Sequence, residues 1–214
     1  DYYNIKSKLI AELGYIRDST SDQLVTNLYD LYRGTADTAL FQNEVIKSLS
    51  RIKTKASYLQ LKKILVKDPP IFETVYDYNS LFSNLDDSLQ LCTVLFPEIM
   101  QLSTLDDYKE KITNLLVTLV DSGYMRPALY EKYLPGIYID AVVALKKQKA
   151  KEEKKMQAEA ALKVSGNDEP ARVYDYNKTG NTLSRYAILL MPFYDKDENV
   201  REFFSRLLQS KDDD

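Results

Sequence analysis

Few of the residue types that do chemistry occur in this sequence. Its 214 residues include no histidine, so the usual general base and the commonest metal ligand are missing. The one cysteine, Cys92, stands in the apolar run from Leu91 to Phe96 and is interpreted as a small buried residue rather than a reactive thiol. The sequence also has no glycine-rich phosphate loop, Cys-x-x-Cys pair or Gly-x-Ser-x-Gly elbow. We therefore predict no catalytic, cofactor-binding or metal-binding residue, and no cofactor.

Acidic and aromatic residues are the remaining candidates for a site. The stretch from Asp195 to Asn199 is rich in oxygen ligands, but it lacks the central glycine and the final glutamate of a calcium-binding EF-hand loop. We interpret it as a helix cap. The 17 tyrosines fit two roles, because a tyrosine at an interface buries its ring while its hydroxyl stays wet, yet tyrosines pack between helices equally well. The sequence leaves both roles open.

Composition places these residues on helices. Six glycines and seven prolines leave few residues for the turns of sheets and barrels. The 29 basic and 32 acidic residues are interleaved and give a net charge of -3, so no single-sign field would attract nucleic acid, and we predict no such partner. No apolar run approaches the roughly 20 residues of a transmembrane helix. We therefore predict no membrane insertion by this segment.

An internal repeat is the strongest structural signal. Eight apolar positions recur as apolar positions 36 residues further along the chain. Within each copy the spacing of three and four is that of one helix face, and a gap leaves room for a turn into a second helix. The first copy is Ile5, Leu9, Ile10, Leu13, Ile16, Val25, Leu28 and Tyr29, and the second is Phe41, Val45, Ile46, Leu49, Ile52, Leu61, Ile64 and Leu65. Each copy is predicted to be a helical hairpin that must stack on a neighbour to cover its apolar face.

The rest of the chain divides by composition. From Lys146 to Lys163 charged helix formers dominate, which predicts a solvated helical extension, with a docking helix or coiled-coil arm as the alternative. Turn-forming residues follow, so 164–181 is predicted to be a linker or long loop. We thus expect a helical-repeat array over 1–163, then this linker, then a further hairpin of a truncated array over 182–214.

The last segment carries a family resemblance. Between Leu183 and Leu208 an apolar helix is followed by Asp195 and then by Val200 and Arg201, which open a second apolar helix. This pattern resembles the HEAT-repeat signature, in which an aspartate in the turn precedes, by six residues, an arginine at the start of the second helix. The resemblance implies an all-α fold, a right-handed stack of antiparallel helical hairpins (an α-solenoid), in which Asp195 and Arg201 join adjacent repeats. An acceptor in the turn also suits a cap of the following helix, and a guanidinium suits a bridge to that acceptor.

Three further stretches resemble a second family. KDPPIFETVYDY, LFPEIM and LLMPFYD are similar to the helical-repeat region that follows the catalytic part of some large bacterial TraB/GumN-like proteins. The hydrolase activity of that family relies on histidine-containing motifs, so the resemblance implies the non-catalytic part of a bacterial protein. Because the sequence begins at Asp1 without a methionine and ends in Asp214 after an acidic run, we expect it to belong to a longer chain.

These features predict a non-catalytic scaffold. Its helical repeats would bind a protein or peptide partner, or would pack against another domain of the same longer chain. The alternative is a helical domain of a hydrolase or cofactor-binding protein that uses aspartate, glutamate and tyrosine side chains. Such a site would need several of these side chains to converge in one pocket with shifted pKa values.

Overall fold

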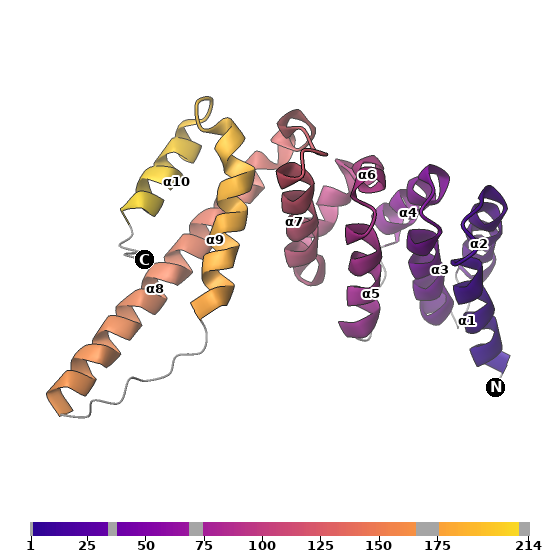
Figure 1. Cartoon of the computed structure of the whole chain (residues 1–214), viewed down its shortest axis with the longest axis horizontal. Coiled ribbons are helices and arrows are strands. Elements are labelled where there is room, and N and C mark those ends of the chain that lie inside the picture. The colour runs from indigo at the N-terminus through magenta and orange to yellow at the C-terminus, as the bar shows by residue number, and fades with distance from the viewer. Residues whose placement is uncertain (1, 34–37, 69–74, 166–175, 210–214) are drawn as a thin grey trace. The chain divides into compact units, whose positions relative to one another are not determined.

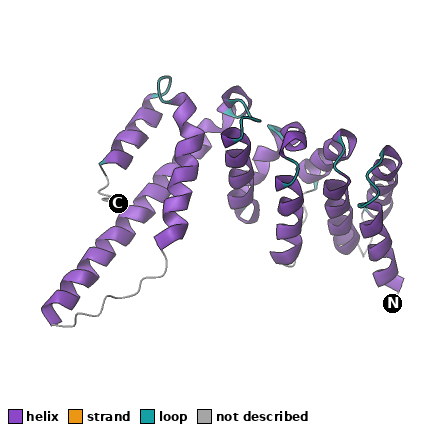
Figure 2. Cartoon of the chain, viewed as in Figure 1, coloured by secondary structure: helices purple, strands orange, loops and turns teal. Residues whose placement is uncertain are grey.

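Both compact units of the chain are built from helices. The computed structural model describes residues 2–33, 38–68, 75–165 and 176–209, and these residues form only helices and the turns and bends between them (Figure 1; Figure 2). The all-α prediction is therefore confirmed. The first unit spans 1–129 and the second spans 130–214, so the chain divides at a position where the sequence predicts no boundary.

The first unit opens with two helical hairpins. Their helices are α1 (Tyr2–Leu13), α2 (Ser19–Tyr32), α3 (Thr38–Ile52) and α4 (Lys55–Lys67). The starts of α1 and α3 are 36 residues apart, and so are the starts of α2 and α4. The caps follow the same offset, because the Ser21 amide donates to the Asp18 side chain at 2.9 Å and the Ser57 amide donates to the Thr54 side chain at 3.0 Å. Equivalent capping residues therefore start the second helix of each hairpin.

The helix α3 lies at the centre of the first unit. It packs against α1 and α2, against α4, and against α5 (Val75–Asp86). Three apolar side chains on the buried face of α3 have counterparts 36 residues further on, in α5, that are buried as well. These side chains are Val45, Ile46 and Leu49 in α3, and Leu81, Phe82 and Leu85 in α5. The 36-residue offset therefore extends to the first helix after the second hairpin.

A glycine allows α1 and α3 to approach closely. A Cβ atom at Gly14 would lie 2.9 Å from the Cα of Ser48, closer than real Cβ contacts. The Ser48 hydroxyl donates a hydrogen bond of 2.8 Å to the Ile10 carbonyl, and Ser48 is fully buried. Small residues at both positions therefore set the distance between the two hairpins.

The chain after α5 is irregular until it enters a long helix. The short α6 (Leu89–Cys92) leads into two 3₁₀ helices, η1 (Thr93–Leu95) and η2 (Glu98–Thr104), on either side of a cis peptide bond between Phe96 and Pro97. The helix α7 (Asp106–Asp121) ends just before Gly123, whose φ of 75° lies in the left-handed region that glycine adopts easily. A further 3₁₀ helix, η3 (Pro127–Leu129), closes the unit. The helix α5 packs against α7, and α4 packs against both η1 and η2.

The second unit consists of a long helix with two shorter helices packed on it. Its elements are η4 (Glu131–Tyr133), α8 (Leu134–Ser165), α9 (Tyr176–Leu190), η5 (Met191–Phe193) and α10 (Glu198–Leu208). The helix α8 contacts α9 and α10 (Figure 1). The core of this unit includes Tyr130, Leu189, Phe193 and Phe203.

The charged segment and the predicted linker meet near the end of α8. Residues 146–163 all belong to α8, as predicted from their helix-forming composition. Of the predicted linker, residues 164 and 165 also belong to α8 and residues 176–181 belong to α9, while residues 166–175 lie outside the described part of the chain. The part of the predicted linker that the structure describes is therefore helical.

Candidate protein-binding surface

The turn before α10 brings Asp195 and Arg201 together through a backbone oxygen. The Nη1 of Arg201 donates a hydrogen bond of 3.2 Å to the carbonyl oxygen of Asp195, and both residues are exposed. The cap of α10 is Asp197, whose Oδ1 accepts from the amides of Asn199 at 2.8 Å and Val200 at 3.2 Å. The prediction that Asp195 caps this helix is wrong, because the acidic residue two positions later takes that place. The role of the pair in joining repeats stays a prediction.

Replacing Asp197 with alanine should cost more stability than replacing Asp195. The first change removes the side chain that caps α10 and is expected to lower the free energy of unfolding of the second unit by about 1 kcal/mol. The second change leaves the backbone oxygen that Arg201 binds, so its effect should stay within about 0.5 kcal/mol. Urea unfolding of the two variants measures both values. Equal losses would mean that the Asp195 side chain has a structural role that the cap does not explain.

The only cysteine is a core residue. Cys92 is fully buried, and its Sγ donates a hydrogen bond of 3.1 Å to the Leu85 carbonyl. Burial, with a smaller contribution from the charge of Asp86, raises the pKa of the Cys92 thiol to about 12. The thiolate is the nucleophilic form, so this thiol is inert at neutral pH. The interpretation of Cys92 as a buried apolar residue is confirmed.

Alkaline pH should weaken the fold through Cys92. In the unfolded chain the thiol ionises near its ordinary pKa of 9.0, whereas the folded chain holds the proton up to about pH 12. The contribution of Cys92 is fully present below pH 9 and is lost as the pH rises toward 12, with a slope of up to about 1.4 kcal/mol per pH unit. We expect the free-energy difference between the parent and Cys92→Ala to be constant from pH 7 to 8.5 and to narrow above pH 9. A difference that stays constant to pH 11 would contradict the burial of this thiol.

The two repeat copies differ in how far their apolar faces are covered. All eight positions of the second copy are buried, but only Ile10, Val25 and Tyr29 are buried in the first. Leu9 is 61% exposed, whereas its counterpart Val45 is 0% exposed. Ile16 is 51% exposed, whereas its counterpart Ile52 is 0% exposed. The hairpin α1–α2 therefore leaves uncovered the face that the hairpin α3–α4 buries.

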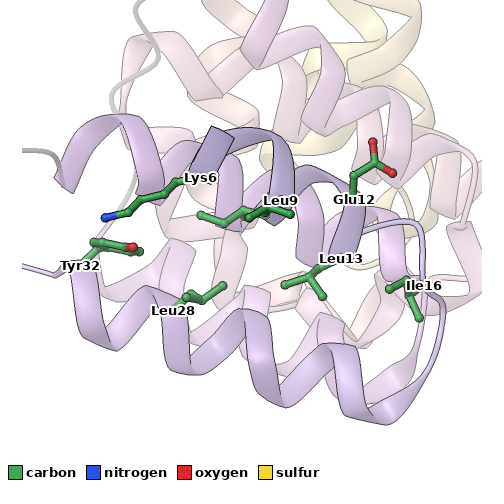
Figure 3. Close-up of a pocket in the computed structure, with 8 residues that line it drawn as sticks. Lys6, Leu9, Glu12, Leu13, Ile16, Leu28 and Tyr32 are labelled. Carbon is green, nitrogen blue, oxygen red and sulfur yellow. The ribbon is translucent and has the colours of Figure 1, made fainter. Parts of the chain in front are cut away.

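This uncovered face forms a groove between α1 and α2, which we call the α1–α2 groove (Figure 3). Its volume is about 480 Å³, and aliphatic side chains make up most of its wall. The lining residues are Lys6, Leu9, Ile10, Glu12, Leu13, Ile16, Leu28 and Tyr32. Figure 3 shows Lys6 and Tyr32 at one end, Glu12 and Ile16 at the other, and the leucines between them. The Nζ of Lys6 lies 5.4 Å from the centre of the Tyr32 ring, so the two helices are antiparallel at that end.

The helix α2 extends the apolar surface beyond what the repeat pattern requires. Leu24 is 47% exposed and Leu31 is 66% exposed, and with Leu28 they share one face of α2 by helical spacing. The counterparts of Leu24 and Leu31, 36 residues further on, are the polar residues Gln60 and Lys67. The sequence carries this signal, because a comparison of the two copies at all positions finds two leucines where the second copy has polar side chains.

A second, more polar pocket lies between α5 and α7. Its volume is about 370 Å³, and its lining includes Asp86, Lys111 and Asn114. Burial raises the pKa of Asp86, although the nearby charge of Lys111 opposes that shift. The Oδ1 atom of Asn114 is buried and accepts no hydrogen bond. This pocket offers the carboxylate of Asp86 to a small polar ligand, whereas the Asn114 Oδ1 is closed to solvent.

The remaining sequence candidates are distributed over the fold. Among the described tyrosines, Tyr29, Tyr58, Tyr108, Tyr130 and Tyr186 are buried between helices, whereas Tyr15, Tyr124 and Tyr194 are exposed. In the part of the chain that the structure describes, no three side chains of the metal-binding types lie together. Within the same residues no helix is both long enough and apolar enough to cross a membrane.

Comparison with known proteins gives no relative for this chain. No protein family, no curated protein and no solved structure matches it. The resemblances to HEAT repeats and to the TraB/GumN-like region therefore stay predictions, and a function must be inferred from the surfaces described above.

Proposed function

We propose that this chain is a non-catalytic helical-repeat scaffold that binds a protein or peptide partner through the α1–α2 groove. The observation that carries the proposal is the uncovered apolar face of the first hairpin, where Leu9 and Ile16 are half exposed or more while their counterparts are fully buried. Contiguous exposed apolar surface at a groove is typical of a protein-interaction site.

A stacked arrangement of hairpins supports this proposal. The helix starts and the caps recur at 36 residues, and the buried positions of α3 recur in α5. The successive contacts α1 with α3, α3 with α5 and α5 with α7 fit an array in which each hairpin touches its neighbours. In a HEAT-like α-solenoid each hairpin buries this face against a neighbouring element, so an apolar face that stays uncovered is suited to receive a partner.

The size of the groove sets the affinity we expect. Burying a half-exposed leucine or isoleucine contributes about 1 kcal/mol. The exposed aliphatic side chains of α1 and α2 would together contribute several kcal/mol, which only partly offsets the roughly 4 to 15 kcal/mol that association costs. The groove alone should therefore give weak binding, and a tight complex would need polar contacts around its rim.

Photo-crosslinking tests the proposal. A benzoylphenylalanine in place of Leu9 is expected to capture one protein in cells that express the chain, and the same residue in place of Leu208 should not. Leu208 is a suitable control because it is 85% exposed and lies on α10 in the other unit. The captured protein, once purified, should bind the chain at least tenfold more weakly after Ile16→Asp. Binding that this substitution leaves unchanged would exclude the α1–α2 groove as the binding surface.

The polar pocket between α5 and α7 supports a second candidate, a helical domain that binds a small ligand or cofactor. Asp86 would bind a cationic or hydroxyl group of the ligand, and a small rotation of the Asn114 side chain would let its unpaired Oδ1 accept a hydrogen bond from that ligand. Ligand-observed NMR with a panel of small amines and polyols tests it. A bound compound that is lost in Asn114→Leu would support this function, whereas a panel without any bound compound would remove it.

A further inference from the structure

We propose that the occupant of the α1–α2 groove is a single amphipathic α-helix of a partner protein, lying parallel to α2. This inference rests on the proposed function and adds the chemistry and the direction of the partner. It follows from what fills the equivalent groove one hairpin further along.

The groove between α3 and α4 is covered by α2. Val25 and Tyr29, on the buried face of α2, are at most 7% exposed, and α2 contacts both helices of the second hairpin. Near the start of α4 the Thr54 hydroxyl donates to Asp22 at 2.7 Å, and just past the end of α4 the Tyr29 hydroxyl donates to Asp68 at 2.7 Å. Since Asp22 precedes Tyr29, α2 runs in the same direction as α4. A helix in the α1–α2 groove would by the same geometry run parallel to α2.

The charges of the α1–α2 groove favour this direction. Lys6 lies at the end near Tyr32, and Glu12 lies at the other end, near the start of α2 (Figure 3). A helix parallel to α2 places its positive N-terminal end near Glu12 and its negative C-terminal end near Lys6. The counterparts of these two residues are the uncharged Gln42 and Ser48, so the charge pattern belongs to this groove and not to the repeat.

Glu12 also indicates that the occupant of the groove is a single helix and not a complete helical hairpin. The counterpart of Glu12 in the second hairpin is Ser48. The end of α1 lies so close to Ser48 that only a glycine fits at position 14. A helix placed against α1 in the same way would have to bury the carboxylate of Glu12, which is costly without a paired charge. One helix along the groove, like α2 on the second hairpin, would begin near Glu12 and leave its exposed carboxylate in contact with water.

The N-cap of α2 specifies one polar feature of the partner. In the second hairpin the Thr54 hydroxyl donates a hydrogen bond to Asp22 of the covering helix α2. The counterpart of Thr54 in the first hairpin is Asp18, whose exposed carboxylate accepts a hydrogen bond from the Ser21 amide. The partner helix therefore needs a donor, such as lysine, where α2 has Asp22. An acidic residue there would face a like charge.

A peptide with the sequence of α2 tests the inference. The probe is a fluorescein-labelled, stapled peptide of residues 18–33 carrying Asp22→Lys, because α2 is the helix that fills the equivalent groove and an unstapled helix of this length is marginal in water. We expect saturable binding to the full chain by fluorescence anisotropy. The substitution Leu9→Asp should weaken it at least tenfold, Ile16→Asp should do the same, and Leu208→Asp should leave it unchanged. The peptide that retains Asp22 should bind several-fold more weakly.

Three outcomes would overturn the inference. The first is that the probe does not bind the parent chain, and the second is that both groove substitutions leave its binding unchanged. The third is a dimer of the chain in solution that Leu9→Asp converts to a monomer, because the occupant of the groove would then be a second copy of the chain. The proposed function is tested separately from this inference. If a partner is crosslinked at Leu9 but does not compete with the helical probe, the scaffold function stands and the proposal of a single-helix occupant is wrong.

Discussion

The substitution Leu49→Asp is expected to unfold the first unit. Leu49 is 0% exposed in α3, which contacts α1, α2, α4 and α5. Removing the leucine leaves a cavity, and the carboxylate finds no water there, so the loss in free energy of unfolding should be at least about 4 kcal/mol. Hydrogen exchange measured by mass spectrometry separates the two units, since amides of α3 and α4 should lose protection while amides of α9 keep theirs.

Leu13→Asp is the matched control, because Leu13 is the counterpart of Leu49 in the first repeat copy. Leu13 is only half-buried and lines the α1–α2 groove, so its carboxylate can reach water. We expect a loss of about 1 kcal/mol, and a larger effect on partner binding than on stability. If both variants lost the same stability, the difference in burial between the two hairpins would be wrong.

This pair of leucines shows what the sequence could and could not predict. The spacing of apolar residues predicts the helices, and the 36-residue offset predicts equivalent starts for α1 and α3 and for α2 and α4. The same pattern treats Leu13 and Leu49 alike, because periodicity identifies the apolar face of a helix but not the element that covers it. The exposure of the α1–α2 groove appears only when the hairpins are packed.

The turn before α10 shows a second limit. Two aspartates, Asp195 and Asp197, precede the helix, and each could cap it as far as residue type is concerned. The cap goes to Asp197, whose extended backbone conformation directs its carboxylate at the amides of the first turn. That choice depends on where the 3₁₀ helix η5 ends, and single-sequence patterns predict helix boundaries least reliably. The division of the chain after Leu129 is likewise a result of packing, which the periodicity of apolar residues does not predict.

The hydroxyl of Tyr130 is expected to be essential for the stability of the second unit. Tyr130 is 0% exposed, and its hydroxyl donates a hydrogen bond of 3.1 Å to the carbonyl of Leu189 in the last turn of α9. Carbonyls in the last turn of a helix have no partner within the helix, and this one lies away from water. Tyr130→Phe keeps the ring but leaves the carbonyl unpaired, so the free energy of unfolding should fall by about 1 to 3 kcal/mol.

Removing the whole side chain should cost more, because the ring of Tyr130 also packs edge-to-face on Phe193, with 5.6 Å between ring centres. Tyr130→Ala is expected to lower the free energy of unfolding by about 3 to 5 kcal/mol and to release the amides of α9 and α10 to exchange while those of α3 stay protected. Tyr124→Phe is the matched control, since Tyr124 is half exposed and should change stability by less than about 0.5 kcal/mol. If Tyr130→Phe were as stable as the parent, water would have to reach the Leu189 carbonyl, and the packing of α9 on the segment before α8 would be looser than the buried hydrogen bond implies.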